Sequence, residues 1–138
     1  MHSFAYHAPA TLPEAIALMG RDPAHSRYLA GGTDLYLALE HRLADVRTLI
    51  DLKTIGTLEG IGVGPGPAWR IGALTRLADV ERHPDLQRWF PALCAAAAVV
   101  GGPPVRNRAT LGGNLCNASP AADAATPLLA LIHRMVVS

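Results

Sequence analysis

Two glycines between an apolar strand and a helix are the first feature of this sequence that could do chemistry. Residues 29–35, LAGGTDL, would turn from the strand into the helix and expose successive backbone N–H groups with no Cβ in the way. Such a turn suits a phosphate. The spacing matches neither GxGxxG nor the Walker pattern, and a tight turn with Thr33 or Asp34 as the helix cap explains the residues equally well, so Asp34 is interpreted as a cap.

A second candidate segment, residues 106–123, reads RNRATLGGNLCNASPAAD. It concentrates small residues, side-chain amides and hydroxyls, which indicates backbone held close to a flat or extended ligand. The alternative is a glycine-rich hairpin in which Gly112 and Gly113 turn and Asn114 and Asn117 satisfy the loop backbone. Two glycine pairs flanked by polar residues favour one shared ligand, and Asp123 suits ribose hydroxyls.

Short strands and helices alternate around these segments. Strands are predicted at 3–7, 27–30 and 48–52, and a capping box, Thr11 to Glu14, starts a helix that Gly20 stops. Residues 60–67 are a glycine- and proline-rich connection and the most plausible subdomain boundary. A strand at 69–73, a helix capped by Thr75, helical turns at 85–90, an alanine-rich helix at 91–100, a helix from Thr126 and a strand from Met135 are expected to follow.

Composition narrows the possible functions. The 138 residues carry a net charge of +1, so there is no basic field to attract nucleic acid. Only 17% are charged and 50% are hydrophobic, which favours a surface partly buried against another chain. Two cysteines, Cys94 and Cys116, are too few for a disulfide framework and fit a reducing cytoplasm. Residues 91–100 are too short for a membrane span. No histidine spacing predicts a metal site, and no GxSxG pattern predicts a hydrolase.

Five motifs in a fixed order carry a family resemblance. They are AGGTDL at 30–35, LIDL at 49–52, IGALT at 71–75, RNRATLGGNL at 106–115 and ASPAAD at 118–123. Together they resemble the FAD-binding medium subunit of the xanthine dehydrogenase family of molybdenum hydroxylases, which includes carbon monoxide dehydrogenase. The resemblance covers nearly the whole chain. It implies an α+β FAD-binding fold of the xanthine dehydrogenase/vanillyl-alcohol oxidase (PCMH) type, with a βαβ subdomain at 1–59 and the first part of a second subdomain at 60–138.

The resemblance also implies which residues hold FAD. Backbone amides of the first segment would wrap the pyrophosphate, Gly101 and Gly102 would lie near the adenine or ribose, and the second segment would line the rest of the dinucleotide. The implied FAD contacts are Arg27, Tyr28, Leu29, Ala30, Gly31, Gly32, Thr33, Asp34, Leu35, Gly101, Gly102, Ala109, Thr110, Gly113, Asn114, Cys116, Asn117, Ser119 and Asp123. None of them is expected to be an acid, a base or a nucleophile, because the flavin does the chemistry.

In such enzymes a molybdopterin-binding large subunit oxidises the substrate and a 2Fe-2S small subunit carries the electrons. The FAD subunit passes them to NAD, oxygen or a quinone. This sequence offers no set of residues for molybdopterin, and Cys116 alone cannot hold a cluster. We therefore expect both partners to be separate chains, in the cytoplasm.

Length is the main departure from the family pattern, because the family's subunit continues for at least as many residues again. The chain is therefore expected to be a fragment or truncated product, or to be completed by another chain, with an unpaired strand edge at its end. Two alternatives stay open: a non-catalytic interaction fragment of such a subunit, and a flavoprotein of the same fold unconnected with molybdenum.

Overall fold

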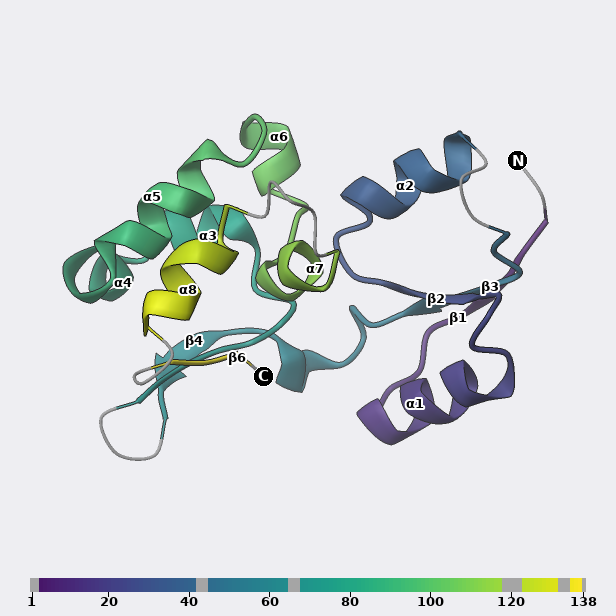
Figure 1. Cartoon of the computed structure of the whole chain (residues 1–138). Coiled ribbons are helices and arrows are strands. Elements are labelled where there is room, and N and C mark those ends of the chain that lie inside the picture. Colours follow the sequence, from purple (N-terminus) through teal and green to yellow (C-terminus); the bar gives the residue numbers. More distant parts are fainter. Residues whose placement is uncertain (1–2, 42–44, 65–67, 118–122, 132–134, 138) are drawn as a thin grey trace. The chain divides into compact units, whose positions relative to one another are not determined.

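The computed structural model describes residues 3–41, 45–64, 68–117 and 123–131, and the backbone of 135–137. The chain divides into two compact units, Met1–Gly56 and Thr57–Ser138. The first contains β1 (Ala5–His7), α1 (Leu12–Arg21), β2 (Ser26–Leu29), α2 (Thr33–Glu40) and β3 (Thr48–Asp51). After the short 3-10 helix η1 (Gly56–Leu58), the second contains β4 (Ile61–Val63), β5 (Trp69–Ile71), α3 (Leu77–Arg82), α4 (Pro84–Trp89), α5 (Pro91–Val99), α6 (Pro103–Arg106), α7 (Leu111–Cys116), α8 (Ala125–Leu131) and β6 (Met135–Val137) (Figure 1).

The first unit is built on a parallel sheet of strand order β1-β3-β2. The connection from β1 to β2 crosses β3 and the next one returns, so right-handed crossovers put α1 and α2 on opposite faces, as Figure 1 shows. The central strand is covered on both sides, and three of its four residues are buried. The predicted βαβ arrangement of these elements is confirmed.

Helix α1 begins with the predicted capping box. The Thr11 hydroxyl accepts from the Glu14 N–H, and the Glu14 carboxylate accepts from the Ala10 N–H. The predicted stop at Gly20 is wrong, because the helix continues to Arg21. Gly20 has open space around its Cα and no left-handed φ, so nothing forces the helix to end there.

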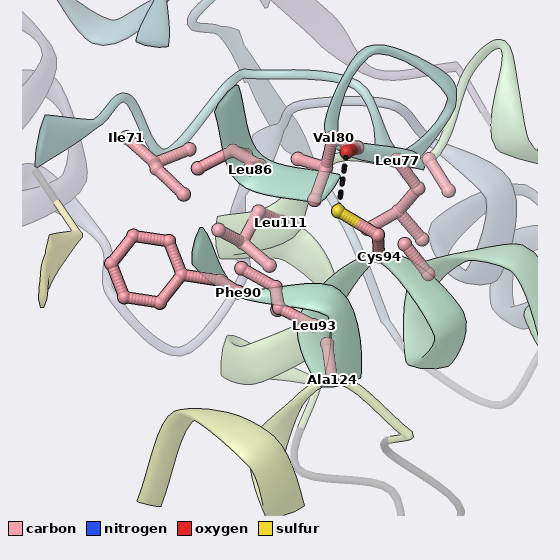
Figure 2. Close-up of a cluster of buried hydrophobic side chains, with 11 residues drawn as sticks. Ile71, Leu77, Val80, Leu86, Phe90, Leu93, Cys94, Leu111 and Ala124 are labelled. Carbon is pink, nitrogen blue, oxygen red and sulfur yellow. Dashed lines mark hydrogen bonds between the residues drawn. The ribbon is translucent and has the colours of Figure 1, made fainter. Parts of the chain in front are cut away.

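The core of the second unit surrounds α5, whose start at Pro91 was correctly predicted. Fully buried Ile71, Leu77, Leu86, Leu93 and Leu111 belong to this cluster (Figure 2). The Cys94 thiol donates to the Val80 carbonyl at 3.3 Å, and burial raises the pKa of this thiol. Cys94 therefore acts as a packing residue.

The sheet of the second unit has strand order β4-β5-β6, with β4 antiparallel and β6 parallel to β5. The predicted strand at Met135 is confirmed, whereas β4 lies inside the stretch interpreted as a connection. Strands and helices are mixed in both units, so the α+β class is confirmed. None of the helices that the structure describes is long and apolar enough to cross a membrane.

Candidate functional site

The first predicted segment forms the turn from β2 into α2. Gly32 caps the helix with φ +81°, a left-handed backbone that strains any larger residue, and a Cβ there would also lie 3.0 Å from Leu29 Cδ1. The predicted cap by Thr33 or Asp34 is wrong, since both residues already lie inside the helix. The reason is that the left-handed backbone at Gly32 starts the helix one residue earlier than a side-chain cap would.

This start leaves the first turn of α2 without a side-chain cap. The Gly32 carbonyl accepts from the Tyr36 N–H at 2.8 Å, and this is the first bond of the helix. The N–H groups of Thr33, Asp34 and Leu35 consequently point out of the helix end, where the macrodipole is positive. These donors, with no Cβ at Gly31 or Gly32 beside them, fit an anionic group such as a pyrophosphate.

Side chains of the same segment are already engaged within the first unit. The Arg27 guanidinium donates to the Ala24 and Ser26 carbonyls at 3.1 and 2.7 Å. The Tyr28 hydroxyl donates to the Ala15 carbonyl at 3.5 Å. Leu29, Ala30, Gly31 and Leu35 are half-buried, whereas Asp34 is exposed. The segment therefore offers a ligand mainly its backbone.

A buried carboxylate that is not among the predicted site residues supports this turn. Asp51, at the end of β3, lies opposite Leu29 in the strand register and is 5% exposed. Its carboxylate accepts from the Lys53 ammonium at 2.7 Å, the Lys53 N–H at 2.9 Å and the Tyr6 hydroxyl at 2.5 Å. Burial raises the pKa of Asp51, but these hydrogen bonds outweigh it and hold the pKa below its ordinary value. An acidic residue directly after an apolar strand is the sequence feature that could have indicated Asp51.

The second predicted segment lies in the other unit and contains α7. Residues 109–112 are bonded to residues 73–77: the Leu77 N–H donates to the Ala109 carbonyl, and the Gly112 N–H donates to the Ala73 carbonyl. A Cβ at Gly112 would lie 2.7 Å from both Ala73 Cβ and Ala73 O. The hairpin interpretation is therefore wrong, because Gly112 and Gly113 lie in α7 and Gly112 makes room for another segment.

Thr110 is the N-cap of α7. Its hydroxyl accepts from the Gly113 N–H at 3.1 Å, so that N–H already has a partner. Ala109 and Thr110 are both buried. This helix end therefore differs from that of α2, since its side-chain cap is present.

Asn114 is the residue of the second segment that most clearly lacks a partner. Its Oδ1 is buried and accepts no hydrogen bond from the residues that the structure describes. A buried acceptor without a donor costs about 1–3 kcal/mol, which a ligand donor would recover. Each unit thus has a feature of its own that fits part of a dinucleotide. The uncapped donors of α2 suit an anionic group, and the orphaned Asn114 Oδ1 suits a ligand donor.

The remaining predicted contacts are at or near the surface. Gly101 has φ +51° and precedes α6, and Gly101 and Gly102 are exposed. Cys116, Asn117 and Asp123 are exposed as well. Ser119 lies outside the residues that the structure describes. The structure thus gathers Thr110, Gly113, Asn114, Cys116 and Asn117 around one short helix, and residues 27–35 around one turn.

A family model described as the FAD binding domain in molybdopterin dehydrogenase matches residues 2–137. The chain belongs to this family. The xanthine dehydrogenase FAD-binding subunit of Escherichia coli O157:H7 is 42% identical over 94% of this chain and 44% of that subunit. The carbon monoxide dehydrogenase medium chain of Hydrogenophaga pseudoflava is 38% identical over 87% of this chain and 42% of its own length.

Solved structures agree with the family assignment and confirm the predicted fold. Reconstituted CO dehydrogenase from Oligotropha carboxidovorans superposes with a TM-score of 0.85 at 33% identity, covering 89% of this chain and 43% of that one. The FAD-binding fold and FAD as the family's cofactor are thereby shown. The chain spans under half the length of these relatives.

Proposed function

We propose that this chain binds FAD as part of the medium subunit of a molybdenum-hydroxylase-type dehydrogenase. The observation that carries the proposal is the glycine turn into α2, which combines a left-handed Gly32 with a helix end that no side chain caps. Bound FAD would accept electrons from a reduced centre and release them to NAD, oxygen or a quinone. The residues of the chain bind the cofactor and orient it.

The first segment contributes backbone donors to the cofactor. In this proposal the N–H groups of residues 31–35 hold the pyrophosphate, and Arg27 to Ala30 form the strand end that fixes the turn. The positive end of the α2 dipole opposes the phosphate charge. Asp34 adds one exposed carboxylate nearby, so its side chain must point away from the phosphates while its N–H donates.

The second segment contributes polar groups to the uncharged parts of the cofactor. Asn114 Oδ1 accepts from a hydroxyl or ring N–H, which satisfies an otherwise orphaned atom. Asp123 accepts from sugar hydroxyls, Asn117 and Ser119 line the dinucleotide, and Cys116 contacts the cofactor as a small thiol. Gly101, Gly102, Ala109, Thr110 and Gly113 provide a close backbone approach.

The proposal extends to the whole assembly. The relatives are FAD or medium subunits of multi-subunit dehydrogenases by name. We infer that a molybdopterin-binding large subunit and a 2Fe-2S small subunit are the partners of this chain, and that the complex is cytoplasmic. Expression together with these subunits should give a complex that contains this chain and FAD.

Titration of the purified chain with FAD tests the binding step. Flavin fluorescence should be quenched, and flavin should be retained on gel filtration and released on denaturation. In the Thr33→Glu variant a new carboxylate lies in the first turn of α2, where it favours the helix by about 0.3–1 kcal/mol but repels phosphate. This variant should fold as well as the wild type and bind FAD at least about tenfold more weakly.

Ala17→Glu is the matched control, because it adds the same charge on an exposed position of α1. It should leave FAD binding within about twofold of wild type, a free-energy change of about 0.4 kcal/mol. Wild-type protein that retains no flavin would contradict the proposal. Equal binding by wild type and Thr33→Glu would show that the pyrophosphate does not lie at α2.

A further inference from the structure

We propose that Arg106 is a positioning residue for FAD binding, which ties α6 and the Gly101 turn to α3. Arg106 is not one of the residues predicted to contact the cofactor. The inference rests on the proposed function, because the segment that Arg106 holds is the one assigned to FAD. Arg106, Glu81 and Gly101 all belong to the second unit.

The Arg106 guanidinium joins two acceptors that are far apart in the chain. Nε donates to Glu81 Oε2 at 2.8 Å, and Nη1 donates to the Gly101 carbonyl at 2.9 Å. The Arg106 side chain is 12% exposed and that of Glu81 is 24% exposed. Such shielding makes this pair stronger than the surface ion pairs of the chain.

Glu81 is a firm anchor because its helix is fixed in the core. The preceding residue, Val80, is completely buried and accepts the Cys94 thiol. The Glu81 carbonyl also accepts from the Gln87 side chain at 2.9 Å, which joins the end of α3 to α4. Movement of Glu81 would therefore disturb the core.

Gly101, the second acceptor of Arg106, lies in a turn that backbone hydrogen bonds alone stabilise only weakly. Gly101 has φ +51°, and a Cβ there would lie 3.1 Å from Val105. α6 contains four residues, and its first bonds are those that the Gly102 carbonyl accepts from Val105 and Arg106. A helix of one turn has little stability of its own. Arg106 supplies the tertiary contact that such a helix needs.

The orientation of α6 is passed directly to the second segment. The Val105 carbonyl accepts from the Ala109 N–H at 2.7 Å, and Ala109 is in turn bonded to Leu77. Arg106 thereby sets the position of the Gly101–Gly102 turn relative to Thr110 and Asn114. Lysine cannot replace it, because an ammonium is a point charge while the guanidinium fork reaches two acceptors in fixed directions.

The test compares Arg106→Lys, Arg106→Gln and Glu81→Gln in the full chain, with FAD as the probe. The energy of one charge-assisted hydrogen bond that keeps the turn in its binding position sets an upper limit of about 100-fold on the affinity change. We expect both Arg106 variants to bind FAD at least about tenfold more weakly at a temperature where circular dichroism shows them folded. Glu81→Gln should lie between them and wild type, because the Gly101 contact remains.

A structural role alone would lower the melting temperature without changing the bound flavin. The distinguishing readout is the visible circular dichroism of the flavin at saturating FAD, which should change in the Arg106 variants. Arg47→Gln is the control, since it removes an exposed ion pair with Asp45 in the other unit and should leave both readouts unchanged.

Wild-type affinity and an unchanged flavin spectrum in Arg106→Lys would overturn the inference. If Arg106→Gln does not fold, Arg106→Lys and Glu81→Gln decide the outcome. Failure of wild-type protein to bind FAD would instead refute the proposed function, so the two failures are distinguishable.

Discussion

The sharpest test of the packing concerns Gly72, which follows β5. A Cβ at this position would lie 2.3 Å from the Leu58 carbonyl oxygen, 2.7 Å from Leu58 C and 2.8 Å from Glu59 C. All three are backbone atoms, so no side chain can swing aside. Gly72→Ala must therefore push residues 58–60 away by about 1 Å, since packed carbon and oxygen atoms stay more than about 3 Å apart.

The loss in free energy of unfolding follows from the hydrogen bonds that this shift breaks. The Leu74 N–H donates to the Leu58 carbonyl and the Gly72 N–H donates to the Gly60 carbonyl, both at 2.8 Å. Two hydrogen bonds at about 1 kcal/mol each, with about 1–3 kcal/mol of overpacking strain, give a loss of roughly 3–5 kcal/mol. For a chain of this size the melting temperature should fall by roughly 10 °C or more.

Thermal and urea unfolding, followed by far-ultraviolet circular dichroism, measure this loss. The matched control is Gly20→Ala, the same chemical change within α1, where nothing lies within 4 Å of the new Cβ. It should stabilise the protein by about 0.5–1 kcal/mol, because alanine is the better helix former. A loss below about 0.5 kcal/mol for Gly72→Ala would refute the close approach.

Three further substitutions test other features by urea unfolding. Asp51→Asn should cost about 1–2 kcal/mol at pH 7. The folded pKa of Asp51 is lowered, so its contribution is present above about pH 4, the ordinary carboxyl pKa, and is lost as the pH falls through the folded pKa. The difference from wild type should therefore shrink as the pH falls below about 4, and a constant difference would contradict the assignment. Thr110→Val removes the acceptor for the Gly113 N–H and should cost about 1 kcal/mol, whereas an unchanged midpoint would show that the cap is unimportant. Leu93→Ala should cost about 2–5 kcal/mol, and a loss below 1 kcal/mol would contradict its place in the core.

Local signals in the sequence predicted the helices of this chain best. The capping box at Thr11 and the proline at position 91 act within a few residues, so the helices that they start could be placed without tertiary information. Strand β4 could not be placed in this way. Its three residues are a strand because Ile61 pairs with Ile71 ten positions later, in a stretch whose glycines and prolines indicate a loop.

The local roles of Thr75 and Gly112 could not be predicted from the sequence. Thr75 looked like a helix cap, yet its hydroxyl bonds to both the N–H and the carbonyl of Gly60, and α3 begins at Leu77. Gly112 looked like part of a turn, yet it is small because Ala73 packs against it. Both roles depend on contacts with segments distant in the sequence, and a local sequence pattern cannot predict such contacts.

The two glycine pairs have different structural roles. The first therefore suits the phosphates of the cofactor and the second suits its hydrogen-bond donors. At Gly32 a left-handed φ leaves the donors of α2 uncapped, so an anionic group gains both hydrogen bonds and the helix dipole there. At α7 the Thr110 hydroxyl already occupies the Gly113 N–H, and the available buried group is an acceptor, Asn114 Oδ1. An acceptor repels phosphate oxygens and needs a donor. We therefore expect Asn114→Asp, which keeps the acceptor and adds a charge, to impair FAD binding less than Thr33→Glu does.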